Sequence, residues 1–263
     1  MFTRCVLLFA ALTAVLPAQA HQQWLAPNFF YEPGDRAWLS FDHTFGDRRF
    51  RPSSGPGSYY RWWVVGPDGL KRPVPFIFLG KTRTVGEVEL ENAGTYRLEG
   101  AEEQMAWTLI RDDGEEKWHP GSRANFAGAD IVRSRTYFNK ALTYISLVSQ
   151  DRAAVAASGD PLEVVFVNHP NELAVGQSFE VRVLASGGPL NAQAVHLFPE
   201  GGSAHDEATA SCTTDAKGLC SFTVGAAGRF LLVTSTRGDH PKGADTDGFS
   251  HSVSVMVEIA ASP

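Results

Sequence analysis

Apolar and polar residues alternate along much of this chain with a period of two. The alternation is clearest at 87–91, 178–184 and 250–258, and turn-forming residues bound each of these runs. A period of two places one set of side chains on a packed face and the other in solvent, as in half-buried strands of antiparallel sheets. The pattern therefore predicts an all-β protein.

The predicted strands fall into two groups. In the first half, tight turns at 66–69, 92–94 and 112–114 contain the Gly, Asn or Asp residues that close reversals require. In the second half the strands are regularly spaced, and their number suits an immunoglobulin-like or transthyretin-like sandwich. The predicted strands are 37–45, 59–65, 85–91, 95–98 and 105–110 in the first half, and 161–167, 178–184, 193–198, 207–213, 219–224, 229–235 and 251–259 in the second.

Two immunoglobulin-like antiparallel β-sandwich domains account for these strands. We place the N-terminal sandwich at 21–150 and the C-terminal sandwich at 161–263, joined by an alanine-rich linker at 151–160. Without its first twenty residues the chain still has enough length for two domains of roughly 100 residues each. Residues 131–150 fit either a helical face or a strand, and we favour a strand after Ala141.

The first twenty residues have the features of a secretory signal peptide. Arg4 supplies the positive charge, residues 5–16 are mostly apolar, and Ala18-Gln-Ala20 is a small-residue cleavage site. Cleavage there would make His21 the first residue of a mature chain in the bacterial periplasm. The apolar stretch is too short to span a bilayer, and no later run could span one, so we expect no transmembrane segment in the mature chain.

Charge and cysteine content narrow the possible partners. The formal net charge is -6, and the Lys and Arg residues are scattered singly, which argues against nucleic acid and anionic membranes. Cys212 and Cys220 flank a turn at 215–218 that should bring two strands back alongside each other. An oxidising compartment favours a disulfide between them. The alternative, a soft-metal thiolate pair, lacks the Cys-x-x-Cys spacing and a nearby His or Met.

Three parts of the chain together resemble a known family. They are the opening His21-Gln-Gln-Trp-Leu-Ala-Pro27, the junction Pro161-Leu-Glu-Val-Val-Phe-Val-Asn-His-Pro-Asn-Glu-Leu173, and Thr213-Thr-Asp-Ala-Lys-Gly218 leading to Ala227-Gly-Arg-Phe-Leu-Leu232. They resemble the periplasmic domain-of-unknown-function family labelled as the periplasmic component of cobalt or nickel uptake. The third part is also similar to immunoglobulin-like and carboxypeptidase-regulatory-like modules, which implies fold only. The resemblance implies metal-related binding, with a membrane transporter as a further partner.

His21 is the first candidate metal ligand. At a free N-terminus its α-amino nitrogen and ring Nδ1 offer a bidentate pair to Ni(II), Co(II), Cu(II) or Zn(II), and an α-amino pKa of about 8 makes deprotonation easy at neutral pH. Further candidates are His43 and, in the Asp-rich loop at 238–251, His240 and His251. His43 and His251 also share the parity of packed apolar residues, so each has a structural alternative. The sequence thus predicts a periplasmic binding protein for a divalent metal.

Two other functions stay open. One is a carbohydrate- or protein-binding module, because exposed aromatic rings stack on sugars or become buried in interfaces. Adjacent Trp62 and Trp63 must face opposite sides of a strand, so only one can enter the core. The other is a copper-dependent oxidase with an N-terminal histidine site. The common catalytic motifs are absent, so we expect no enzyme. The tryptophans all lie in the first half: Trp24, Trp38, Trp62, Trp63, Trp107 and Trp118.

Overall fold

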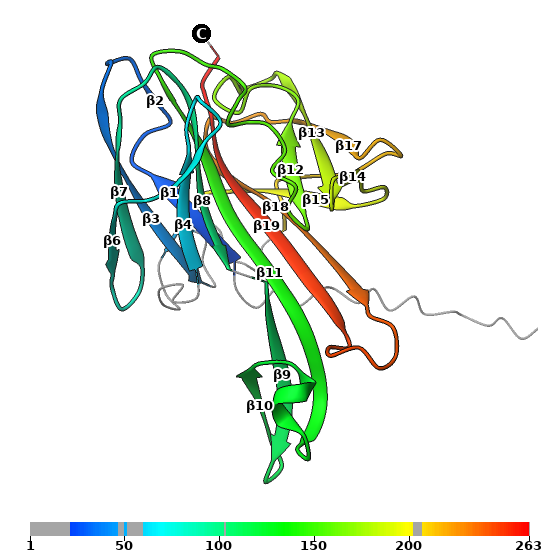
Figure 1. Cartoon of the computed structure of the whole chain (residues 1–263). Helices are drawn as coiled ribbons and strands as arrows, with labels where there is room; N and C mark the ends of the chain where they lie inside the picture. Colours follow the sequence, from blue (N-terminus) through cyan, green and yellow to red (C-terminus); the bar gives the residue numbers. More distant parts are fainter. Residues whose placement is uncertain (1–21, 47–49, 52–59, 103, 202–206, 263) are drawn as a thin grey trace, which may run out of the picture.

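The computed structural model describes residues 22–46, 50–51, 60–102, 104–201 and 207–262, and its fold is all-β (Figure 1). Every predicted strand overlaps an observed one. In the described part of the chain, no helix is long and apolar enough to cross a membrane. The elements are β1 Gln22–Pro27, β2 Tyr31–Glu32, β3 Ala37–Gly46, β4 Tyr60–Val65, β5 Lys71–Pro73, β6 Phe76–Leu79, β7 Thr84–Leu90, β8 Gly94–Glu102, β9 Met105–Asp112, β10 Glu115–Pro120, the 3-10 helix η1 Arg123–Phe126, β11 Asp130–Leu147, β12 Glu163–Phe166, β13 Ser178–Ala185, β14 Gly188–Pro189, β15 Ala194–Pro199, β16 Ala210–Thr213, β17 Leu219–Thr223, β18 Gly228–Asp239 and β19 Gly248–Ile259.

The strands form three sheets. The N-terminal sheet has the order β1-β3-β7-β6, and the C-terminal sheet has the order β12-β13-β14, with β17 also paired to β13. Between them runs the central sheet, β16-β15-β18-β19-β11-β8-β4-β5, in which β2 and β9 also pair with β11, and β10 pairs with β9. The N-terminal and C-terminal sheets each cover part of the central sheet, which gives the two sandwiches that the sequence predicts (Figure 1).

The central sheet is continuous through both halves of the chain, which the sequence did not predict. Strand β11 of the first half pairs in parallel with β19 of the second, from Arg135↔Gly248 to Thr143↔Met256. On β11, Ala141 and Ile145 belong to the N-terminal core, whereas Leu142 and Tyr144 belong to the C-terminal core.

The ambiguity of 131–150 follows from this arrangement. A strand buried on both faces shows a nearly continuous apolar run instead of alternation, so the pattern could also fit a helix. The strand is in fact longer than predicted and begins at Asp130. Residues 151–160, where we expect the linker, lie between β11 and β12, and Ala154 and Val155 among them are buried.

Cys212 and Cys220 form the predicted disulfide, with their Cα atoms 5.8 Å apart. Their strands lie alongside each other as expected, but they are not hydrogen-bonded neighbours, because Cys212 lies in β16 of the central sheet and Cys220 in β17 of the C-terminal sheet. The turn between them crosses from one sheet to the other. The disulfide therefore links the two layers of the C-terminal sandwich.

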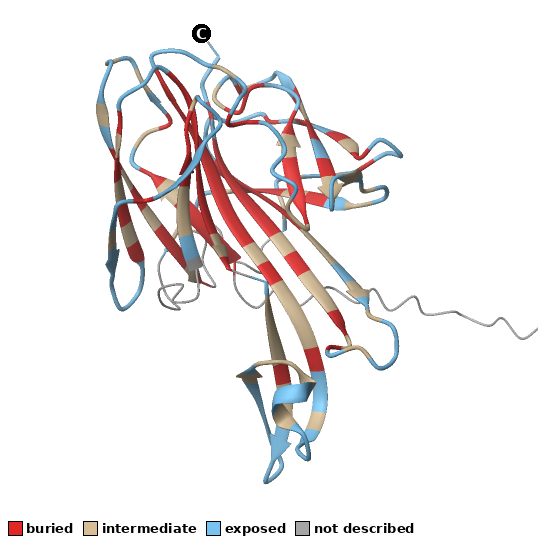
Figure 2. Cartoon of the chain, viewed as in Figure 1, coloured by how far each residue is buried: buried red, intermediate tan, exposed pale blue. Residues whose placement is uncertain are grey.

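One part of the central sheet extends beyond both sandwiches. We call it the blade, comprising residues 105–139 and 235–252, and it projects at the bottom of Figure 1. Its two segments are joined by the β11–β19 pairing and by Asp247, which accepts hydrogen bonds from Arg123 (2.6 Å) and from the backbone N–H of Ser134 (2.7 Å). Figure 2 shows many exposed and half-buried residues here, so this region offers side chains to solvent.

Candidate functional site

Three aromatic side chains gather on one face of the blade. Trp107 of β9, Trp118 of β10 and Tyr137 of β11 line an open cleft of about 240 Å³, together with Glu102 at the end of β8 and Asn139 of β11. We call these five residues the aromatic cleft. Residues at alternate positions of a strand share a face, so Tyr137 and Asn139 point the same way.

The rings of the aromatic cleft leave apolar surface open to solvent. The Trp118 and Tyr137 ring centroids are 6.0 Å apart, and the rings stand nearly perpendicular at 86°. Edge-to-face packing of this kind is favourable for aromatic pairs. Trp118 nevertheless remains 42% exposed, so much of its side chain is left uncovered by the rest of the chain.

A chain of hydrogen bonds holds the polar base of the cleft. Ser252 Oγ donates to Asn139 Oδ1 at 2.6 Å, and Asn139 Nδ2 donates to Glu102 Oε2 at 2.5 Å. Glu102 is buried, and this burial raises the pKa of its carboxyl, while hydrogen bonds from Asn139 and Trp107 act in the opposite direction. A carboxyl with a raised pKa in a cleft is a typical feature of functional sites.

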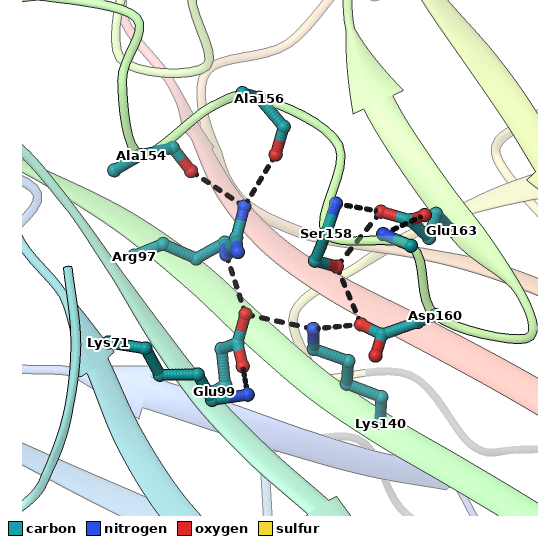
Figure 3. Close-up of polar contacts among 10 residues, drawn as sticks. Lys71, Arg97, Glu99, Lys140, Ala154, Ala156, Ser158, Asp160 and Glu163 are labelled. Atoms are coloured by element: carbon teal, nitrogen blue, oxygen red, sulfur yellow. Dashed lines mark hydrogen bonds and ion pairs between the residues drawn. The ribbon is translucent and has the colours of Figure 1, made fainter. Parts of the chain in front are cut away.

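A second polar cluster is drawn in Figure 3. It lies on the other face of the central sheet, because Glu99 and Lys140 are each an odd number of positions from the cleft residue of the same strand. Glu99 Oε1 accepts hydrogen bonds from Arg97 Nε (2.7 Å) and Lys140 Nζ (2.8 Å), and Lys71 Nζ lies 2.7 Å from Glu99 Oε2. Burial raises the pKa of Glu99, but the charges of Lys140 and Arg97 outweigh it and bring the pKa to about 2. Lys140 also donates to Asp160 at 2.6 Å.

The Glu99 cluster fastens the linker to the central sheet. Arg97 donates to the backbone carbonyls of Ala154 and Ala156, both at 2.8 Å. The adjacent cavity has a volume of only about 10 Å³, which is close to the smallest space that holds one water molecule. This cluster is therefore a structural connection, and the aromatic cleft is the better candidate for binding a ligand.

The candidate metal ligands do not assemble in the described part of the chain. His21 lies outside the described residues. His43 is fully buried, as its strand parity predicts, with its ring 5.8 Å from that of Trp62, and burial lowers its pKa to about 3. No group of three or more His, Cys, Asp or Glu residues among the described residues is placed to hold a metal ion. A metal site at His21 stays a prediction.

His240 and His251 lie at the end of the β18–β19 hairpin and have structural surroundings. His240 Nδ1 is 2.8 Å from Thr246 Oγ1, and the ring of His251 stacks on Phe249 at 4.6 Å and meets Phe138 edge-on at 6.0 Å. His251 is buried, and desolvation, followed by the charge of His240, lowers its pKa. These aromatic neighbours match the packed position that its strand parity predicts.

Trp62 and Trp63 face opposite sides of their strand, as the sequence predicts, but the sequence did not indicate the polar residues of the aromatic cleft. Trp62 packs against the N-terminal core, while Trp63 faces the other way and has Lys71 Nζ 5.3 Å from its ring centroid. Glu102 and Asn139 were not candidates, because neither belongs to a recognisable motif.

The fold and the cleft together define a two-sandwich β-protein with an open aromatic site. The chain belongs to the family described as a domain of unknown function, DUF4198, which matches residues 18–238. No curated protein matches the chain. The periplasmic metal-uptake role implied by the resemblance is not part of that description.

Similar solved structures show only distant likeness. The D0–D1 domain of intimin is 12% identical, with a TM-score of 0.24, and the match covers 90% of this chain and 97% of that one. The fibronectin(III)-like modules of Clostridium thermocellum CbhA are 10% identical, with a TM-score of 0.21 and coverage of 90% and 94%. A DUF4785 family protein of Legionella pneumophila is 13% identical, with a TM-score of 0.24 and coverage of 80% and 50%. Such low scores support no functional argument.

Proposed function

We propose that this chain is a carbohydrate-binding protein whose aromatic cleft holds one sugar ring. The observation that carries the proposal is the solvent-exposed Trp118 beside Trp107 and Tyr137, above a polar base of Glu102 and Asn139. A sugar ring has an apolar C–H face that stacks on an aromatic ring. It also has hydroxyl groups that pair with carboxyl and amide groups.

The size and polarity of the cleft favour a small, hydroxyl-rich ligand. Its volume of about 240 Å³ is below the roughly 300–1,000 Å³ of pockets that enclose drug-sized molecules. Asn139 Nδ2 has a second N–H available beyond the one given to Glu102, and the carboxyl of Glu102 can accept further hydrogen bonds. An open cleft also lets a longer glycan continue beyond the bound ring.

Replacing Trp118 with alanine tests the proposal. We screen the mature-length chain against a glycan array of neutral and acidic oligosaccharides, and measure each hit by calorimetry. Trp118→Ala should weaken binding about tenfold or more, because it removes the stacking surface. Trp38→Ala is the matched control, because Trp38 is 53% exposed in β3 of the N-terminal sheet and does not line the cleft.

Two results would contradict the proposal. One is a chain that binds no glycan on the array. The other is a glycan that Trp118→Ala and the unchanged protein bind equally well. A loss of affinity in Trp38→Ala as large as in Trp118→Ala would place the binding site elsewhere.

A further inference from the structure

Two arginines continue the cleft face of β11 beyond its aromatic residue. Along Arg133-Ser-Arg-Thr-Tyr-Phe-Asn139, the alternate positions are Arg133, Arg135, Tyr137 and Asn139. Their cross-strand partners agree with a common face, because Arg135 pairs with the cleft residue Trp107 on β9. Successive residues of this set are about 7 Å apart along the strand.

A third arginine approaches the same face from the other side. Tyr137 pairs with Ser250 of β19, and Ser250 pairs with Arg237 of β18. Paired residues share a face, and two strand spacings place the Cα of Arg237 about 10 Å from that of Tyr137. The small side chain of Ser250 lies between them. Burial raises the pKa of Tyr137, and the charges of Arg135, Arg237 and Arg133 oppose this shift, which agrees with their proximity.

These arginines differ in whether their guanidinium groups already have partners within the chain. Arg135 donates to the backbone carbonyl of Phe249 at 3.0 Å and lies 3.5 Å from Asp239. Arg133 and Arg237 are exposed, and neither has a carboxylate of any described residue within ion-pair distance. Their guanidinium groups are therefore available for a ligand.

We propose that the sugar in the aromatic cleft is acidic, a uronate-containing oligosaccharide whose carboxylates bind to Arg133 and Arg237. This inference rests on the proposed carbohydrate-binding function. A planar guanidinium matches a carboxylate in a two-bond arrangement. Glu102 would repel a carboxylate placed at the base, so the acidic group points away from Glu102 and toward the arginines.

Matched pairs of ligands test the charge preference. The probes are oligosaccharides of galacturonate, of mannuronate and of hyaluronate, each compared by calorimetry with its own methyl ester, which keeps the ring and removes the charge. We expect at least one acidic form to bind about tenfold or more tightly than its ester. Its affinity should also fall as sodium chloride is added, because salt screens exposed charges.

A double arginine variant tests whether Arg133 and Arg237 cause the preference for the acidic sugar. Arg133→Gln with Arg237→Gln should bring the affinity for the acidic form down to that for the ester, while leaving ester binding unchanged. Arg229→Gln is the matched control, because Arg229 lies near the opposite end of the same strand as Arg237. Circular dichroism and thermal unfolding of each variant verify that the fold is intact.

The outcomes separate the two proposals. Equal affinity for acid and ester forms, lost in Trp118→Ala, would overturn the charge preference and keep the carbohydrate site. An acid preference that survives in the double arginine variant would also overturn the assignment to these residues. Absence of binding to every acidic and neutral glycan would overturn the carbohydrate-binding function itself.

Discussion

Glu99 and Glu102 are two buried glutamates on one strand, and they lie in different electrostatic surroundings. An offset of three residues places them on opposite faces of β8. Glu99 is surrounded by Arg97, Lys140 and Lys71, which hold its pKa at about 2. Glu102 instead accepts hydrogen bonds from the neutral side chains of Asn139 and Trp107, and its pKa is raised by burial.

The comparison shows that burial alone does not define a role. The oxygens of a buried carboxylate that is paired with cations already accept hydrogen bonds within the protein, and these bonds connect segments of the chain. A buried carboxyl beside aromatic rings and an opening keeps capacity for a ligand.

The largest expected effect is on folding, from Glu99→Gln. The variant leaves three cations around a neutral amide, and breaking a buried ion pair in this way costs about 3–5 kcal/mol. Urea denaturation at pH 7 measures the loss in the free energy of unfolding. Glu102→Gln is the matched control and should change it far less. Equal losses in the two variants would remove the distinction between the two glutamates.

The second expected effect is a loss of folding stability in mild acid, which comes from buried His43 and not from the glutamates. The pKa of His43 is lowered from 6.5 to about 3 by burial, so below pH 6.5 the unfolded chain takes up a proton that the folded chain does not. Stability should therefore fall with acidification, by about 2 kcal/mol at pH 5. Glu99, with a pKa of about 2, keeps its contribution until the pH falls below its ordinary value of 4.5.

A pH series of urea denaturation on His43→Leu measures this contribution. The slope of stability between pH 6.5 and pH 5 should be shallower in the variant than in the unchanged protein. Parallel slopes would exclude His43 as the source of the acid sensitivity.

The smallest effect is the pH response of Glu102. Because its pKa is raised in the folded state, the folded chain binds this proton more tightly than the unfolded chain does. Its contribution is greatest below the unfolded pKa and declines as pH rises through the folded pKa. Glu102→Gln should remove that decline and be at least as stable as the unchanged protein at pH 7. A variant that is less stable at pH 7 yet shows no change of slope would argue against the raised pKa.

Local patterns along the chain were enough to predict the class of fold and several local details. Period-two alternation located the longer strands, because half-buried strands expose every second residue. It also placed His43 inward and separated Trp62 from Trp63 by parity. The spacing of Cys212 and Cys220 predicted their disulfide. Short edge strands such as β6 and β10 were missed, because so few residues show no clear period.

The continuous central sheet and the aromatic cleft depend on contacts between distant parts of the chain, so they could not be predicted from local patterns. The β11–β19 pairing joins residues more than a hundred positions apart, and nothing local in either strand specifies its partner. The cleft likewise combines Glu102 with Asn139 through strand pairing. Glu99 and Glu102 look alike in the sequence, and they differ because long-range contacts give one of them cations and the other neutral partners. Local patterning specifies which face a side chain occupies, whereas its chemistry depends on what the fold brings to that face.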